Sequence, residues 1–129
     1  RAREMTGIVL VTHAGLGESL RHQTEIILGR MVMMTTVSVS EGANLDEALA
    51  SVRAALAMGA DPAGAVVLTD LPGATPHNLA CRAATDRAMP VVSGLNLPML
   101  LKVLNHADKP PAELAMLACD GGQQAIFAT

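Results

Sequence analysis

The chain has 129 residues, half of them apolar and 16% charged, which suits one domain with its own core and excludes a disordered or acidic solvating segment. Nine basic and twelve acidic residues give a formal charge of −3, and the basic residues form no block. We therefore expect neither nucleic acid nor an anionic membrane surface as the main partner. The single aromatic residue, Phe127, excludes base-stacking platforms and aromatic cages.

The ends of the chain and its apolar runs bear on location. Residues 1–4 precede Met5 and are expected to be an upstream extension or an expression remnant, with residues 5–129 forming one domain. The apolar runs are strand-length, well short of the roughly 20 residues that cross a bilayer. No secretory signal is recognisable in this pattern, so we expect no membrane insertion and a cytoplasmic protein.

The first half of the chain alternates strand and helix patterns. Residues 7–12 (GIVLVT) are a continuous apolar run, typical of a strand covered on both faces. A helix is expected over about residues 18–28, closed by Gly29, and a second strand over residues 32–39. Asn44 then resembles a helix N-cap, and the apolar stripe behind it predicts a helix that stops at Gly59.

The second half continues the alternation. Residues 64–69 (GAVVLT) predict a third buried strand that is followed by Asp70. Thr75 is expected to cap a helix that has Pro76 in its first turn and runs to about Arg87. The remaining expected elements are a strand at 90–93, helices at about 98–104 and 111–118, a helix end at Gly121 and Gly122, and a candidate edge strand at 124–128.

This order of elements predicts the fold class. Strands that alternate with helices at this spacing form βαβ units with right-handed crossovers. We expect a single α/β domain with a mostly parallel open sheet, helices on both faces and a candidate antiparallel edge strand at the C-terminus. The eight methionines are expected to fill the aliphatic core rather than to form a binding surface.

Polar residues end the predicted strands, where open α/β sheets bind their ligands. His13 ends the first strand and Asp70 follows the third, so they converge if these strands are neighbours. Thr75 and the N-terminus of the helix behind it would add an anion-binding element to the same crevice. A strand-end histidine or aspartate can also be purely structural, a hydrogen-bonded residue or a helix cap.

One imidazole, one carboxylate and a helix N-terminus suit a reaction that passes through a phosphoryl group. A neutral imidazole is nucleophilic near neutral pH, and a carboxylate that accepts one ring N–H leaves the other nitrogen free. Gly15 and Gly73 let the backbone approach a phosphate closely. Asn78 could bond either the loop backbone or the phosphate.

Three segments resemble the enzyme IIA component of the mannose family of the bacterial phosphotransferase system. They are residues 7–20 (GIVLVTHAGLGESL), 70–80 (DLPGATPHNLA) and 91–104 (VVSGLNLPMLLKVL). The resemblance implies that His13 accepts a phosphoryl group from phosphorylated HPr and passes it to a IIB component. It further implies that Asp70 pairs with the imidazole and that the Thr75 hydroxyl lies near the phosphate. Some members exchange an antiparallel edge strand in a homodimer, and residues 124–128 are the candidate here.

Other functions remain open at this point. A regulatory module, whose His13 phosphorylation state selects partners without sugar transport, would use the same chemistry. A nucleotide or small-molecule binder on the same fold is a third alternative. The chain contains no P-loop motif. Its dinucleotide fingerprint is incomplete, because Leu20 stands where the third glycine would be. A phosphohistidine donor needs no bound nucleotide or metal, so we expect no cofactor and no metal site.

Overall fold

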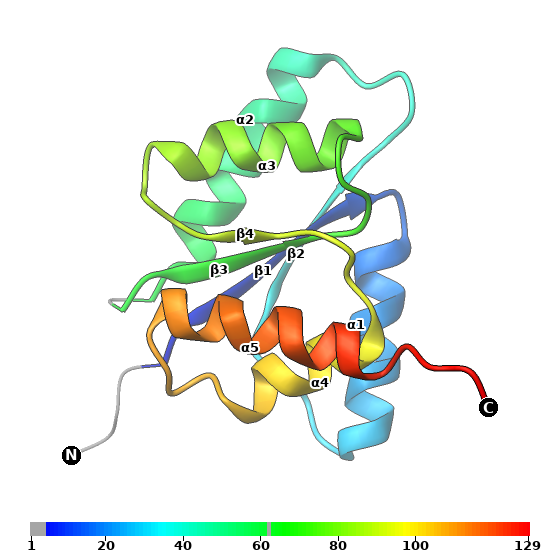
Figure 1. Ribbon diagram of the computed structural model, residues 1–129. Helices are drawn as coiled ribbons and strands as arrows, with labels where there is room; N and C mark the ends of the chain where they lie inside the picture. The colour runs from blue at the N-terminus through cyan, green and yellow to red at the C-terminus, as the bar shows by residue number, and fades with distance from the viewer. Residues whose placement is uncertain (1–4, 62) are drawn as a thin grey trace.

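A computed structural model describes residues 5–61 and 63–129, and the expected extension at residues 1–4 lies outside the described residues. Four parallel strands form one sheet in the order β2-β1-β3-β4 (Figure 1). The strands are β1 (Gly7–His13), β2 (Thr35–Val39), β3 (Ala65–Thr69) and β4 (Val91–Val92). The predicted α/β class with a parallel sheet is confirmed.

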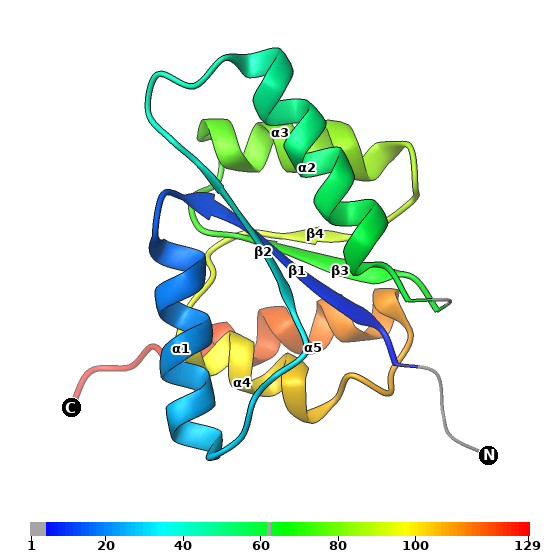
Figure 2. The same cartoon turned by 180° about the vertical axis from the view of Figure 1, so that it is seen from behind.

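Helices cover both faces of the sheet, as Figures 1 and 2 show from opposite sides. The helices α2 (Leu45–Gly59) and α3 (Thr75–Thr85) lie on one face. The opposite face carries α1 (Leu16–Leu28), α4 (Leu97–Asn105) and α5 (Pro111–Gln124). Each of α1, α2 and α3 follows a strand and leads the chain back to the start of the next parallel strand, as the βαβ pattern requires. The helix α4 follows β4 and leads into α5.

The core is divided by the sheet into two aliphatic layers. Ile8 and Leu10 of β1 pack toward α4 and α5, whereas Val9 and Val11 pack toward α2 and α3. The continuous apolar runs of β1 and β3 follow from this arrangement, because side chains of both strand faces are buried. Each fully buried aliphatic side chain contributes about 1.5–3 kcal/mol relative to exposure.

The C-terminal helix differs from the prediction. Gly121 and Gly122 do not end α5, which continues to Gln124. The two glycines lie against α4, where a Cβ on Gly121 would come 2.6 Å from Cβ of Lys102. These glycines therefore permit close helix packing, a role that local sequence cannot separate from a helix stop. Residues 125–129 belong to no strand, so the candidate antiparallel edge strand is not formed in the single chain.

The methionines also depart from the prediction of core filling. Met34 and Met99 are buried, but five others are exposed at the surface: Met5, Met31, Met33, Met58 and Met116. Three of these five lie near the amino ends of β1 and β2 rather than around His13. An apolar surface of this kind is a common feature of binding sites.

Among the described residues, no helix is long and apolar enough to cross a membrane.

Candidate functional site

Two strand ends bring His13 and Asp70 together. His13 is the last residue of β1, and Asp70 directly follows β3, the strand that pairs with β1 in parallel through Val11 and Thr69. The carboxyl ends of adjacent parallel strands meet at one edge of the sheet, so the two side chains face each other. His13 Nδ1 lies 2.7 Å from Asp70 Oδ2. The structure thus contains the convergence that the strand order predicts.

The Asp70 carboxylate is held by several donors. Its Oδ2 accepts the backbone N–H of His13 at 3.0 Å, and its Oδ1 accepts the backbone N–H of Leu71 at 3.0 Å. Burial alone would raise the pKa of Asp70, but the hydrogen bonds from His13 and the attraction to its ring outweigh burial and lower that pKa. Asp70 is therefore ionised near neutral pH and can only accept hydrogen bonds.

This geometry determines the tautomer of His13. Because an ionised carboxylate only accepts, the ring must donate its Nδ1–H to Asp70, and the neutral imidazole then carries its lone pair on Nε2. The His13 side chain is 52% exposed, whereas that of Asp70 is only 9% exposed. The pair therefore presents a nucleophilic nitrogen to solvent while its orienting carboxylate is sheltered.

The segment after His13 is held by Thr12 and by a strand-to-helix network. Gly15 adopts φ 83°, a left-handed conformation that favours glycine, and donates its N–H to Ser38 Oγ at 3.3 Å. Ser38 Oγ in turn donates to the Glu18 carboxylate at 2.9 Å. On the other side, Gly17 donates its N–H to the buried Thr12 hydroxyl at 3.0 Å. The loop that begins α1 is thereby fixed beside the imidazole.

Sequence reasoning missed Ser38 and Glu18. Ser38 lies in β2, whose parallel register places it beside Thr12, one residue before His13. The polar serine within an otherwise β-branched run is a weak signal, and its relevance depends on β2 being the neighbour of β1. Glu18 sits in the first turn of α1, where a carboxylate also interacts favourably with the helix N-terminus.

The loop between β3 and α3 forms the other side of the site. Gly73 is exposed and has φ 82°, again in the left-handed region. Asn78 donates from Nδ2 to the Gly73 carbonyl at 3.1 Å. Of the two interpretations left open for Asn78, the structure shows the bond to the loop backbone.

The predicted cap at Thr75 is wrong. Ala74 is the N-cap of α3 and Thr75 is its first residue, since the Ala74 carbonyl already accepts the Asn78 N–H at 3.0 Å. Thr75 is exposed at this helix N-terminus, which opens next to the loop that follows Asp70. Pro76 occupies the first turn, as expected. Its φ is fixed by the ring, and its missing backbone N–H would have had no acceptor within the helix.

His77 faces the interior rather than the loop. Its Nδ1 lies 2.7 Å from Thr69 Oγ1, and its Nε2 lies 3.4 Å from Cys81 Sγ. This contact ties α3 to the end of β3 and so supports the position of Asp70. No cluster of three or more potential metal-ligating His, Cys, Asp or Glu side chains occurs within residues 5–61 and 63–129.

Comparison with known proteins gives this geometry a family. The model of the family described as "PTS system fructose IIA component" matches residues 7–116. The chain belongs to this family. It is a IIA component of the mannose family of the phosphotransferase system (PTS), as the sequence resemblance implied.

Curated relatives of this IIA component differ in length. Over 124 residues it is 31% identical to the PTS system mannose-specific EIIAB component of Escherichia coli (strain K12), an alignment covering 94% of this chain and 38% of that protein. It is 28% identical over 102 residues to the PTS system sorbose-specific EIIA component of Lacticaseibacillus casei, covering 78% and 73% of the two chains. The IIA component thus spans well under half of the EIIAB relative.

Solved structures agree with the family assignment. The mannose/sorbose-specific IIA subunit from Enterococcus faecalis has a TM-score of 0.87 and 28% identity, with 97% of this chain and 95% of that chain covered. The EIIA component from Streptococcus agalactiae has a TM-score of 0.81 and 25% identity, with 96% and 97% covered. The similarity to both therefore extends over nearly the whole IIA component.

The lowered pKa of Asp70 predicts a pH-dependent contribution to stability. A carboxyl whose folded pKa lies below its ordinary value of 3.8 stabilises the fold above that value, and the contribution is lost as the pH falls through the folded pKa. Asp70→Asn should therefore lower the free energy of unfolding by about 1 kcal/mol at about pH 5.5, where the carboxylate accepts its hydrogen bonds.

Urea denaturation of wild type and Asp70→Asn at several pH values measures this difference. The two free energies of unfolding should begin to converge once the pH falls below about 3.8, the ordinary pKa, and should meet only below the folded pKa of Asp70. A difference that stays constant over this range would show that Asp70 gains nothing from being ionised in the fold.

Proposed function

We propose that this chain is a phosphocarrier in which His13 accepts a phosphoryl group from phosphorylated HPr and passes it to a IIB component of a sugar phosphotransferase system. The observation that carries the proposal is the 2.7 Å contact between His13 Nδ1 and Asp70 Oδ2, which leaves Nε2 as the nitrogen with a free lone pair. Family membership supports a role in the phosphotransferase system, and the exposed ring supports contact with another protein.

Phosphoryl uptake needs one bond to form as another breaks. The His13 Nε2 lone pair attacks phosphorus, and the bond from phosphorus to the donor breaks with its electron pair returning to the donor. The ring keeps its Nδ1 proton and gains a positive charge, which the Asp70 carboxylate stabilises at hydrogen-bond distance. Transfer to the IIB component is the same step in reverse, with the acceptor nucleophile in place of the donor.

The surrounding backbone supports a phosphate beside His13. The N-terminus of α3 offers the backbone N–H groups of Thr75 and His77 and the positive end of its dipole, with the Thr75 hydroxyl at its first residue. Gly15 and Gly73 have no side chain to obstruct the approach of the phosphate. Asn78 contributes by holding the Gly73 carbonyl, so its place in the phosphate site is indirect.

The rim of the site suits a protein partner. Two exposed leucines are close in sequence to the His13 and Asp70 pair: Leu16 begins α1, and Leu71 directly follows Asp70. Exposed apolar side chains beside a reactive group favour transient docking of another protein surface. We further propose that the chain works in the cytoplasm as a homodimer, for which exposed Ile126 and Phe127 after α5 offer an apolar contact.

Phosphorylation in vitro tests the acceptor directly. Incubation with phosphoenolpyruvate, enzyme I and HPr should add one base-stable, acid-labile phosphate to the wild type and none to His13→Ala. His22→Ala is the matched control, since His22 is exposed on α1 and should leave labelling unchanged. Full labelling of His13→Ala would refute the assignment.

The carboxylate has its own test. Asp70→Asn should slow phosphate uptake by roughly 10²-fold, because the amide no longer stabilises the charged ring or enforces the Nδ1–H tautomer. Thermal unfolding should remain cooperative, because a loss of about 1 kcal/mol is small against the stability of a domain of this size. If cooperative melting is lost, Asp70 is a structural residue and the slow uptake says nothing about the phosphoryl step.

A pull-down separates transport from purely regulatory binding. Phosphorylated wild type and His13→Ala are each exposed to a lysate, and a IIB component should be recovered with the phosphorylated form. Recovery of other proteins without any IIB component would favour the regulatory module.

A further inference from the structure

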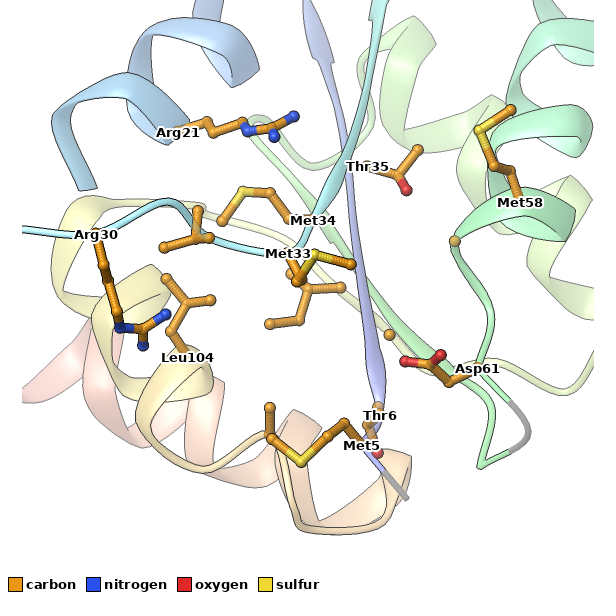
Figure 3. Close-up of a pocket in the computed structure, with 15 residues that line it drawn as sticks. Met5, Thr6, Arg21, Arg30, Met33, Met34, Thr35, Met58, Asp61 and Leu104 are labelled. Carbon is orange, nitrogen blue, oxygen red and sulfur yellow. The ribbon is translucent and has the colours of Figure 1, made fainter. Parts of the chain in front are cut away.

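A cleft lies at the opposite end of the sheet from His13. It is formed by the first residues of β1 and β2, the segment between α1 and β2, the end of α2 and the end of α4 (Figure 3). His13 ends the seven-residue strand that begins at this cleft, so the two regions are roughly 20 Å apart. The cleft has a volume of about 710 Å³, within the range of roughly 300–1,000 Å³ that small-molecule sites occupy.

The floor of the cleft is apolar. Ile8, Val32 and Ala107 are buried at its base, and Leu104 of α4 adds to it. Met33 and Met58 border the cleft, with side chains 90% and 80% exposed. Methionine side chains are flexible and polarizable, so they can fold over an aliphatic ligand and make van der Waals contacts with it.

Basic and acidic side chains lie on different sides of this floor. Arg21 and Arg30 come from α1 and the segment after it, and Asp61 lies across β1 from Arg30 (Figure 3). The contacts of the two guanidiniums are long: Arg21 Nε is 4.0 Å from Glu25 Oε2, and Arg30 Nη1 is 3.5 Å from the Met31 carbonyl. The Glu25 carboxylate also accepts the Val32 N–H at 3.0 Å and so stays beside Arg21. The planar guanidinium of Arg30, with five donors, can replace its long contact with hydrogen bonds to an anion.

We propose that this cleft binds a small monoanionic amphiphile. Its carboxylate or phosphate group lies toward Arg30, and its aliphatic chain covers the floor between Ile8 and Leu104. Asp61 faces the far end of the chain and repels a second negative charge there, so the site selects a single anionic end. The concave shape favours one molecule over a lipid surface, and the proposal does not depend on the chemistry of His13.

Methyl NMR with decanoate as the probe tests this site. Decanoate below its micelle concentration should shift the Met33 and Met58 methyl signals in a saturable way. Decanol, with the same chain and no charge, should bind about tenfold more weakly, and decanedioate should also bind more weakly because of Asp61.

Three variants, one of them a control, test the contribution of the charged side chains to ligand binding. Arg30→Gln should weaken decanoate binding about tenfold and leave decanol binding unchanged. Asp61→Asn should remove the discrimination against decanedioate. Arg53→Gln is the matched control, since Arg53 is an exposed arginine of α2 that pairs with Asp86 and does not line the cleft.

Four results would overturn the proposal. The first is the absence of saturable decanoate shifts, and the second is decanoate binding that Arg30→Gln leaves intact. The third is sedimentation with phosphatidylglycerol vesicles in the absence of decanoate binding, which would identify a lipid surface as the ligand. The fourth is a set of methyl shifts that depend on protein concentration without decanoate, which would identify a second copy of the chain as the occupant.

Discussion

The hydrogen bond between His13 Nδ1 and the Asp70 carboxylate is the interaction on which the site depends. It joins the ends of two neighbouring strands at 2.7 Å and connects a sheltered carboxylate to an exposed ring. Since the carboxylate also accepts the backbone N–H groups of His13 and Leu71, its position is determined by the chain itself. The ring nitrogen that this bond leaves free, Nε2, is the one that we propose accepts the phosphoryl group.

The fold supplies this geometry through the order of its strands. β1 and β3 are central, parallel and buried on both faces, so their carboxyl ends are rigidly placed side by side. Edge strand β2 adds Ser38, which links the loop after His13 to α1. The helix α3 is tied to the end of β3 by His77. Rigid elements thus position both the nucleophile and the surface proposed to receive the phosphate.

The sequence predicts the buried strands, because apolar runs carry that information locally, and it places His13 and Asp70 at strand ends. That the two side chains meet depends on β1 and β3 being neighbours, which the family resemblance implied and the strand pairing shows. The sequence does not predict features that depend on neighbours distant in the chain. Glycine is typical of a helix end, yet Gly121 lies within α5 and allows α4 to pack closely against it. Ser38 is relevant to the site only because β2 lies beside β1. The exposed methionines at the amino end of the sheet are not predictable for the same reason, since hydrophobicity alone does not distinguish a core from a cleft.

The nitrogen that carries the phosphoryl group tests the central claim most directly. Proton-coupled ¹⁵N and ³¹P NMR of the phosphorylated chain distinguishes a phosphoryl group on Nε2 from one on Nδ1. We expect coupling of phosphorus to Nε2 of His13, with the Nδ1 proton retained and hydrogen-bonded to Asp70. Phosphorylation at Nδ1 would contradict the assignment, because that nitrogen would first have to leave the carboxylate that is held 2.7 Å away.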